Sequence, residues 1–187
     1  MMTQNQMDNS ALSGNIESRI FLIGFMGSGK STLGSKLARQ IGYDYVDMDD
    51  LVEETAGMTV PGIFNEHGEA VFRKWEHDIL QELCLREKVI VSTGGGAPCH
   101  SNMIQIMNDH GASIYIKLSP EALKNRLLNS KTERPLIKGK SEPELLDFIT
   151  TLLSTREHYY NQARLSVDGF NLQIGELVQK LQESGIL

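Results

Sequence analysis

Residues 24–32 read GFMGSGKST and combine closely spaced glycines with one lysine and two hydroxyl side chains. Gly24, Gly29, Lys30 and Ser31 satisfy the pattern G-x-x-x-x-G-K-[S/T]. Glycines let backbone N–H groups surround an anion, the lysine reaches the outer phosphates, and the serine hydroxyl can hold Mg²⁺. The stretch therefore predicts a nucleoside triphosphate site. We expect its nucleotide contacts to come from Gly27, Ser28, Gly29, Lys30, Ser31 and Thr32.

The flanks of this loop support a phosphate site over an ordinary glycine-rich turn. The apolar run at 19–24 is typical of a strand buried on both faces, and residues 33–41 show helical spacing. No N-K-x-D guanine motif follows, and the third strand ends in IVSTGGG, with a glycine turn where a mechanical ATPase or regulator has an acidic residue. These absences argue against a GTPase and against a mechanical ATPase or regulator.

Two carboxylates, Asp47 and Asp49, are predicted at the end of a second short strand, over residues 43–49. Residues two apart on a strand point to one side, and ligands of open α/β sheets sit at that end. One carboxylate can support a metal ion through water, while the other accepts a hydroxyl proton from a substrate. The alternative is that both acids, beside Asp50, cap a helix.

Two arginines are candidates for holding an anionic substrate. Arg73 points away from the apolar face of its helix and could instead pair with Glu69 one turn earlier. Arg156 falls on the apolar face of a later helix, where an unpaired charge would be costly. Its partner is either a structural carboxylate or a ligand carboxylate, which a guanidinium group binds with two hydrogen bonds.

Two further segments could complete a substrate site. The glycines of TGGGA (93–97) form either a tight turn or a bare backbone surface on which a substrate ring rests. The basic segment 129–142 is either a solvated loop or a flap that closes over ATP and directs Arg134 at the transferred phosphoryl group.

Strand and helix patterns alternate along the chain, which predicts a parallel α/β sandwich. The strands are expected at 19–24, 43–49, 88–97, 112–118 and 164–169. After the loop helix and a broken helical region at 51–68, the remaining helices are expected at 69–86, 101–111, 119–128, about 145–163 and around 177–181. Ser119 and Pro120 provide the N-cap and first turn of one of them.

The 187 residues suit one domain, with a polar tail at 1–18 and a folded part at 19–187. A net charge of −6 argues against sequence-independent nucleic-acid binding. No stretch has the length and apolar character of a membrane span. The two cysteines, Cys84 and Cys99, lack metal-ligand spacing and indicate packing residues in a reducing cytoplasm.

Six motifs in this order, GFMGSGKST, DMD, FRKWE, STGGGA, ERPLI and STREHYY, make the chain resemble the shikimate kinase family over roughly residues 19–185. The resemblance implies a three-layer α/β/α P-loop fold of the nucleoside-monophosphate-kinase type with five parallel strands in the order 2-3-1-4-5. It also implies a substrate-binding lobe at about 49–75 and a lid at about 129–141. We further expect a monomer that binds neither nucleic acid nor membrane. The implied reaction is ATP-dependent phosphorylation of the 3-hydroxyl of shikimate, on the route to aromatic amino acids.

The resemblance also assigns roles to individual residues. Lys30 contacts the β- and γ-phosphates, Ser31 ligates Mg²⁺, and Asp47 supports the metal through water. Asp49 binds the ring hydroxyls and serves as the base. The remaining implied contacts are the substrate carboxylate at Arg73 and Arg156, the substrate pocket at Gly94, Gly95 and Gly96, adenine at Arg126, and the lid arginine at Arg134.

Two other functions are considered beside this one. A related small-molecule kinase, such as a gluconate kinase, would share the P-loop and the lid. A nucleotide-gated binding module without transferase activity would need no base, so Asp47 and Asp49 argue against it. The combination of the DxD and FRxxE patterns with the triple glycine favours a flat ring that bears one carboxylate and adjacent hydroxyls.

Overall fold

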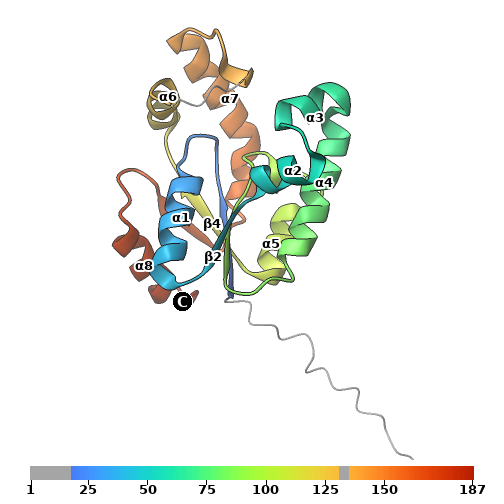
Figure 1. Ribbon diagram of the computed structural model, residues 1–187. Coiled ribbons are helices and arrows are strands. Elements are labelled where there is room, and N and C mark those ends of the chain that lie inside the picture. The colour runs from blue at the N-terminus through green and yellow to red at the C-terminus, as the bar shows by residue number, and fades with distance from the viewer. Residues whose placement is uncertain (1–17, 131–134) are drawn as a thin grey trace, which may run out of the picture.

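A computed structural model describes residues 18–130 and 135–187 of the chain as a three-layer arrangement of helices around a central sheet (Figure 1). The sheet has five strands in the order β2-β3-β1-β4-β5, and neighbouring strands pair in parallel. The expected strand order is therefore confirmed. Apart from Ser18, the predicted polar tail lies outside the described residues.

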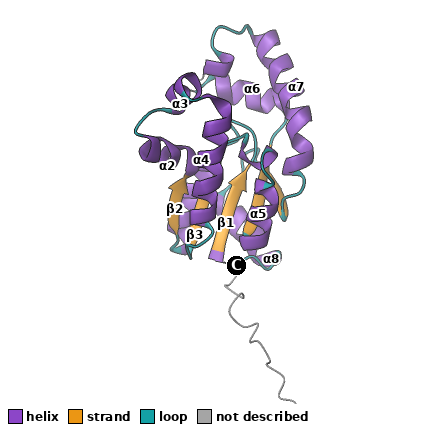
Figure 2. Ribbon diagram, turned by 90° about the vertical axis from the view of Figure 1, so that its right-hand side faces the viewer, coloured by secondary structure: helices purple, strands orange, loops and turns teal. Residues whose placement is uncertain are grey.

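The strands are short and follow the predicted positions closely. Their bounds are β1 Arg19–Ile23, β2 Asp44–Asp47, β3 Val89–Ser92, β4 Ala112–Lys117 and β5 Leu165–Asp168. Figure 2 shows β1 and β2 pointing toward the end of the molecule where α3 and α6 lie. The chain leaves the sheet at that end, so the loops that follow the strands gather there.

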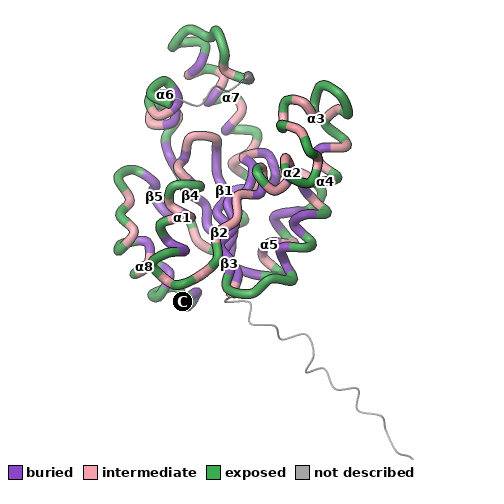
Figure 3. The backbone as a smooth tube through the Cα atoms, viewed as in Figure 1, coloured by how far each residue is buried: buried purple, intermediate pink, exposed green. Residues whose placement is uncertain are grey.

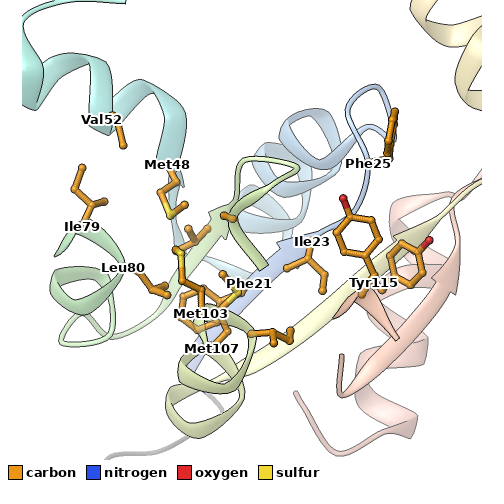
Figure 4. Packing of buried hydrophobic residues seen from close by; sticks show 14 of the residues in the cluster. Phe21, Ile23, Phe25, Met48, Val52, Ile79, Leu80, Met103, Met107 and Tyr115 are labelled. Carbon is orange, nitrogen blue, oxygen red and sulfur yellow. The ribbon is translucent and has the colours of Figure 1, made fainter. Parts of the chain in front are cut away.

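Both faces of the sheet are covered, as the apolar strands predict. Along β1, Phe21 and Ile23 face one apolar cluster and Ile20 and Leu22 face the other. Figure 4 shows Phe21 and Ile23 packed with side chains from α2, α4, α5 and β4. The opposite cluster contains side chains of α1 and α8. The three inner strands, β1, β3 and β4, therefore lie in the buried centre, whereas the edge strands β2 and β5 and the helices carry exposed residues (Figure 3).

Within the described residues the helices match the expected order, with changes at several ends. Their bounds are α1 Lys30–Ile41, α2 Met48–Ala56, α3 Val60–Glu66, α4 Gly68–Leu83, α5 Met103–His110, α6 Pro120–Leu128, α7 Glu142–Tyr160 and α8 Ile174–Glu183, with 3₁₀ turns at Ala97–Cys99 and Pro135–Ile137. Ser119 caps α6 as predicted, because its hydroxyl accepts a hydrogen bond from Ala122 N at 3.2 Å.

Helix α7 begins at Glu142, whereas the apolar periodicity predicted a start near Leu145. A reciprocal cap explains the difference. The backbone N–H and the hydroxyl of Ser141 donate to Glu144 Oε2 at 2.8 and 2.6 Å. The sequence S-x-x-E carries this signal, and such a cap satisfies N–H groups that a helix start leaves unpaired. The searched helices of the described part include none long and apolar enough to cross a membrane.

A glycine within α1 sets the distance between this helix and the sheet. A Cβ at Gly34 would lie 2.7 Å from Tyr45 Cε2, 3.0 Å from Ser92 Oγ and 3.1 Å from Leu22 Cδ1. These atoms belong to three adjacent strands. A larger residue would therefore push α1 away from all of them.

We expect Gly34→Ala to destabilise the protein by about 1–3 kcal/mol, because overpacking a tight contact outweighs the better helix propensity of alanine. The matched control is Gly175→Ala in α8, where a Cβ would meet nothing within 4 Å. That variant should change stability by less than about 1 kcal/mol, in the stabilising direction. Urea unfolding of both variants measures the difference, and equal stabilities would contradict the predicted close packing.

Candidate functional site

A cavity of about 1120 Å³ opens at the end of the molecule to which the strands point. Most of the predicted site residues line it, although they come from distant parts of the sequence. They are Gly27, Gly29, Lys30, Ser31, Thr32, Asp47, Asp49, Arg73, Gly94, Gly95, Gly96, Arg126 and Arg156. Ser28 is buried beneath the loop and does not line the cavity. Arg134, predicted at the lid, lies outside the described residues.

The glycine loop has the backbone geometry that an anion site requires. Gly27 and Gly29 have φ of 78° and 95°, in the left-handed region that favours glycine. Gly29 is the residue before α1, and Leu33 N donates to its carbonyl at 2.9 Å. The N–H groups of residues 30–32 therefore lie in the first turn of α1, where helix geometry leaves such donors without intrahelical partners.

Lys30 and Arg126 place two cations beside this loop. The ammonium group of Lys30, which is 8% exposed, donates to Gly24 O and Phe25 O at 2.8 and 3.0 Å. The guanidinium group of Arg126 donates to Ser28 O and Gly169 O, both at 2.8 Å. Since these bonds lie along N–H directions of a planar group, they leave its flat faces for stacking.

Asp47 and Asp49 were predicted to lie together at the end of one strand, but the structure separates them. Strand β2 ends at Asp47, and Asp49 lies in the first turn of α2. The strand stops because Asp47 Oδ1 accepts a hydrogen bond from Asp49 N at 3.2 Å, which caps the helix. Asp47 Oδ2 accepts hydrogen bonds from Ser31 Oγ at 2.7 Å and from the Tyr45 hydroxyl at 3.2 Å. Both acids still face the cavity, so Asp47 caps α2 and lines the site at once.

The carboxyl of Asp49 lines the cavity close to other charged groups. Burial raises the pKa of its carboxyl, the charge of Asp47 raises it further, and the nearby Lys30 ammonium opposes both effects. A raised pKa makes a carboxylate a better proton acceptor. The environment of Asp49 therefore suits proton transfer better than an exposed aspartate would.

The three successive glycines each face a different charged side chain. A Cβ at Gly94 would lie 2.7 Å from Asp49 Oδ1, and one at Gly96 would lie 2.8 Å from Arg73 Nη2. A Cβ at Gly95 would lie 3.6 Å from Arg156 Nη1. Tyr160 fixes this turn from α7 by donating its hydroxyl to Gly95 O at 2.5 Å. Any larger residue at 94 or 96 would displace the charged groups.

Arg73 pairs with two acids of its own helix. Its Nη2 lies 3.0 Å from Glu69 Oε1, as the structural alternative predicted, and its Nη1 lies 2.5 Å from Glu76 Oε2. Glu76 is fully buried, and its Oε1 has no hydrogen-bond partner among the described residues. Burial raises the pKa of Glu76 to about 7, although Arg73 lowers it. The pair holds the arginine in place beside Gly96.

Arg156 has a different environment. Within the described part of the chain, no carboxylate lies within ion-pair distance of it. Its guanidinium carbon lies 5.9 Å from the centre of the Phe25 ring, on the cavity side of α7. A half-buried cation without a protein anion is well suited to an anionic ligand.

Sequence reasoning gave no role to three side chains that support the site. Glu76 was seen only as a letter of the FRKWE motif, Tyr160 as a letter of STREHYY, and Tyr45 as a residue of a strand. Their partners are Arg73, Gly95 O and Asp47, respectively. Both cysteines are packing residues, as predicted, because Cys84 belongs to the apolar cluster and Cys99 packs against it. Burial raises the pKa of both thiols.

Comparison with known proteins gives a consistent result. A family model described as shikimate kinase matches residues 26–184. The shikimate kinase of Bacteroides thetaiotaomicron is 41% identical over 169 residues, covering 88% of this chain and 97% of that protein. The shikimate kinase of Bacteroides fragilis is 44% identical over 145 residues, covering 78% of this chain and 81% of that protein.

Solved structures agree with the sequence comparison. The crystal structure of the Bacteroides thetaiotaomicron shikimate kinase has a TM-score of 0.86 and covers 91% of this chain and 99% of its own. The Acinetobacter baumannii shikimate kinase, solved in complex with shikimate, is 30% identical with a TM-score of 0.76. It covers 89% of this chain and 91% of its own. A gluconokinase from Sinorhizobium meliloti, 19% identical with a TM-score of 0.57, shares the fold alone.

The buried carboxyl of Glu76 predicts a pH dependence of stability. Its pKa is about 7 in the folded protein against an ordinary 4.5, so the folded protein binds more protons between these values. The free energy of unfolding therefore loses this contribution as the pH rises through that window. We expect Glu76→Gln to make the free energy of unfolding fall less between pH 4.5 and 7, measured by urea unfolding without substrates.

The matched control is Glu69→Gln, which removes an exposed partner of the same arginine. This variant should keep the parent's pH dependence. If the Glu76→Gln protein also followed the parent curve at every pH, the carboxyl of Glu76 would not titrate in this range.

Proposed function

This chain belongs to the shikimate kinase family, and on that premise we propose that it transfers the γ-phosphoryl group of ATP to the 3-hydroxyl of shikimate. The products are shikimate 3-phosphate and ADP. The reaction is a step in the synthesis of chorismate and the aromatic amino acids.

One observation carries this proposal: the cavity has two chemically different halves. One half is the N-terminal turn of α1 with the Gly27–Gly29 loop, a shape that suits a polyphosphate. The other half joins two guanidinium groups, of Arg73 and Arg156, to the bare backbone of the triple glycine. A small ring acid can lie between them with its carboxylate on the arginines and its hydroxyls toward Asp49.

We propose the following roles in the transfer. Asp49 accepts the proton of the 3-hydroxyl while the oxygen of that hydroxyl bonds to the γ-phosphorus. The bond between the γ-phosphorus and the ADP oxygen breaks. Lys30 neutralises charge on the β- and γ-phosphates once they replace the loop carbonyls as its partners. The transition state of such transfers is largely dissociative, so correct positioning contributes as much as proton removal.

The residues beside the phosphate loop fit Mg²⁺. Ser31 Oγ and Asp47 Oδ2 lie 2.7 Å apart, and both are oxygen atoms, the ligand type that this ion prefers. The described residues contain no cluster of three or more His, Cys, Asp or Glu side chains that could hold a metal. This suits an ion held mainly by the nucleotide and water, with Ser31 as direct ligand and Asp47 acting through water. When bound, the ion neutralises charge on the nucleotide phosphates.

Arg126 completes the nucleotide half in this proposal. Its guanidinium group is fixed at both ends by carbonyls of the phosphate loop and of the loop after β5. We propose that adenine stacks on the face of this group. The proposed lid over about 129–141 would add Arg134 to the transferred phosphoryl group, and the segment at about 49–75 would form the substrate lobe. We further propose that the protein is a cytoplasmic monomer that binds neither nucleic acid nor membrane.

A coupled assay for ADP release tests the proposed activity. We expect shikimate to support turnover in the presence of ATP and Mg²⁺, and gluconate to support none. The product can be identified as shikimate 3-phosphate by mass. Turnover with gluconate but not with shikimate would make the protein a different hydroxy-acid kinase, and ATP binding without turnover on either would make it a binding module.

Replacing Arg156 by alanine separates the two halves of the cavity. We expect the KM for shikimate to rise by roughly tenfold or more, because a charge-assisted hydrogen bond contributes about 1.5–3 kcal/mol. The dissociation constant for ADP, measured by calorimetry, should change little. Arg39→Ala, on the exposed side of α1, is the control for loss of an arginine charge. An unchanged KM for shikimate would mean that Arg156 has a structural partner instead.

A further inference from the structure

We propose that Tyr45 is a positioning residue for the metal site, holding Asp47 through its hydroxyl in the orientation that the nucleotide-bound Mg²⁺ requires. This inference rests on the proposed function, which assigns Ser31 and Asp47 to the metal. It adds a residue of the sheet to that site. The residue does not line the cavity, so it acts through Asp47 and without contact to the nucleotide.

The hydrogen bonds around Asp47 carry the inference. A carboxylate offers about four lone-pair positions. Among the described residues, three donors occupy such positions: the Ser31 hydroxyl and the Tyr45 hydroxyl at Oδ2, and the Asp49 N–H at Oδ1. This leaves room for one more donor, and a metal-bound water is a donor of that kind. The carboxylate is thereby fixed in rotation before any ligand enters.

The tyrosine hydroxyl itself is held firmly in place. Tyr45 and Asp47 are two apart on β2, so their side chains leave the same face of the sheet. The ring of Tyr45 packs against the cluster formed with α1 and fills the space that the absent Cβ of Gly34 leaves free. The Tyr45 hydroxyl lies 3.2 Å from Asp47 Oδ2, and the packing of its ring limits how far it can move from that oxygen.

The arrangement matters because Ser31 would have two tasks. As a metal ligand it presents an oxygen lone pair to the ion, so its proton must point elsewhere, and Asp47 Oδ2 accepts it. If the carboxylate of Asp47 rotated, the proton of Ser31 would lose its acceptor, and the Ser31 hydroxyl would lose its fixed orientation. Tyr45 opposes that rotation with a second hydrogen bond to the same oxygen. Groups behind a metal site that orient its ligands in this way commonly alter metal affinity when removed.

The competing explanation is that Tyr45 only packs α1 against the sheet. Tyr43 offers the comparison, since it precedes β2, packs partly against the same cluster, and its hydroxyl makes no hydrogen bond within the described part of the chain. A packing role resides in the ring and survives a change to phenylalanine. A positioning role resides in the hydroxyl and does not.

The test measures ADP binding by calorimetry, in excess Mg²⁺ and in EDTA, for the parent, Tyr45→Phe and Tyr43→Phe. We expect Tyr45→Phe to weaken binding about tenfold in Mg²⁺ and to leave binding in EDTA unchanged. The concentration of Mg²⁺ for half-maximal activity should rise similarly, with little change in the KM for shikimate. Tyr43→Phe should match the parent in every measurement, and the thermal midpoints of all three proteins should agree closely.

A double-mutant cycle shows whether the effect passes through Asp47. In an Asp47→Ala background, adding Tyr45→Phe should change Mg²⁺-dependent ADP binding no further. An additive loss would overturn the proposal, as would equal or tighter Mg²⁺-dependent binding by Tyr45→Phe alone. If the variant is less stable, binding measured well below its midpoint still decides the question. Failure of the parent itself to bind ADP with Mg²⁺ would instead refute the proposed function.

Discussion

The parallel register of three neighbouring strands is the constraint on which the site depends. In this register Leu22 of β1 lies beside Ser92 of β3, and Ser92 lies beside Asp47 of β2. Because parallel strands end at the same edge, the phosphate loop, the triple glycine and the acidic turn leave the sheet at one level. Residues nearly 70 positions apart in the sequence thereby line a single cavity.

Charged groups of both signs lie close together within that cavity, and their closeness explains the glycines. Three cations of different origin, Lys30, Arg73 and Arg156, share the space with Asp49 and the buried Glu76. A side chain at residue 94 or 96 would collide with the carboxylate of Asp49 or the guanidinium group of Arg73, which explains the glycines at these positions. Lys30 is held by backbone carbonyls and Arg73 by two carboxylates, which reduces the reorganisation that a charged ligand would demand of these two groups.

Several residues combine a structural task with a chemical one. Asp47 caps α2 and also receives the Ser31 hydroxyl, and Arg126 links the phosphate loop to the loop after β5. Arg73 pairs with Glu69, which is the plain helix-surface contact, yet it also reaches the fully buried Glu76. For Asp47 and Arg73, the sequence analysis set a helix cap or a helix-surface ion pair against a role in the site. The structure shows that each residue makes the structural contact and also lines the cavity. A side chain fixed by a structural contact is better placed to bind a ligand.

The sequence by itself determined the phosphate loop, the order of strands and helices, and most cavity residues, because each depends on local pattern: glycines that permit positive φ, and periods of two or 3.6 residues. It misplaced the start of α7 and the end of β2, where the side chains of Glu144 and Asp47 cap helices. Only the tertiary structure decided which groups of separate elements meet: Tyr160 of α7 on Gly95, and Ser31 of α1 on Asp47. Packing of the helices on the sheet was needed to define these contacts, because no local pattern relates the elements that they join. The pairs Arg73–Glu76 and Tyr45–Asp47 have local spacing, but that spacing did not show that Glu76 is fully buried or that Asp47 is also bonded to Ser31.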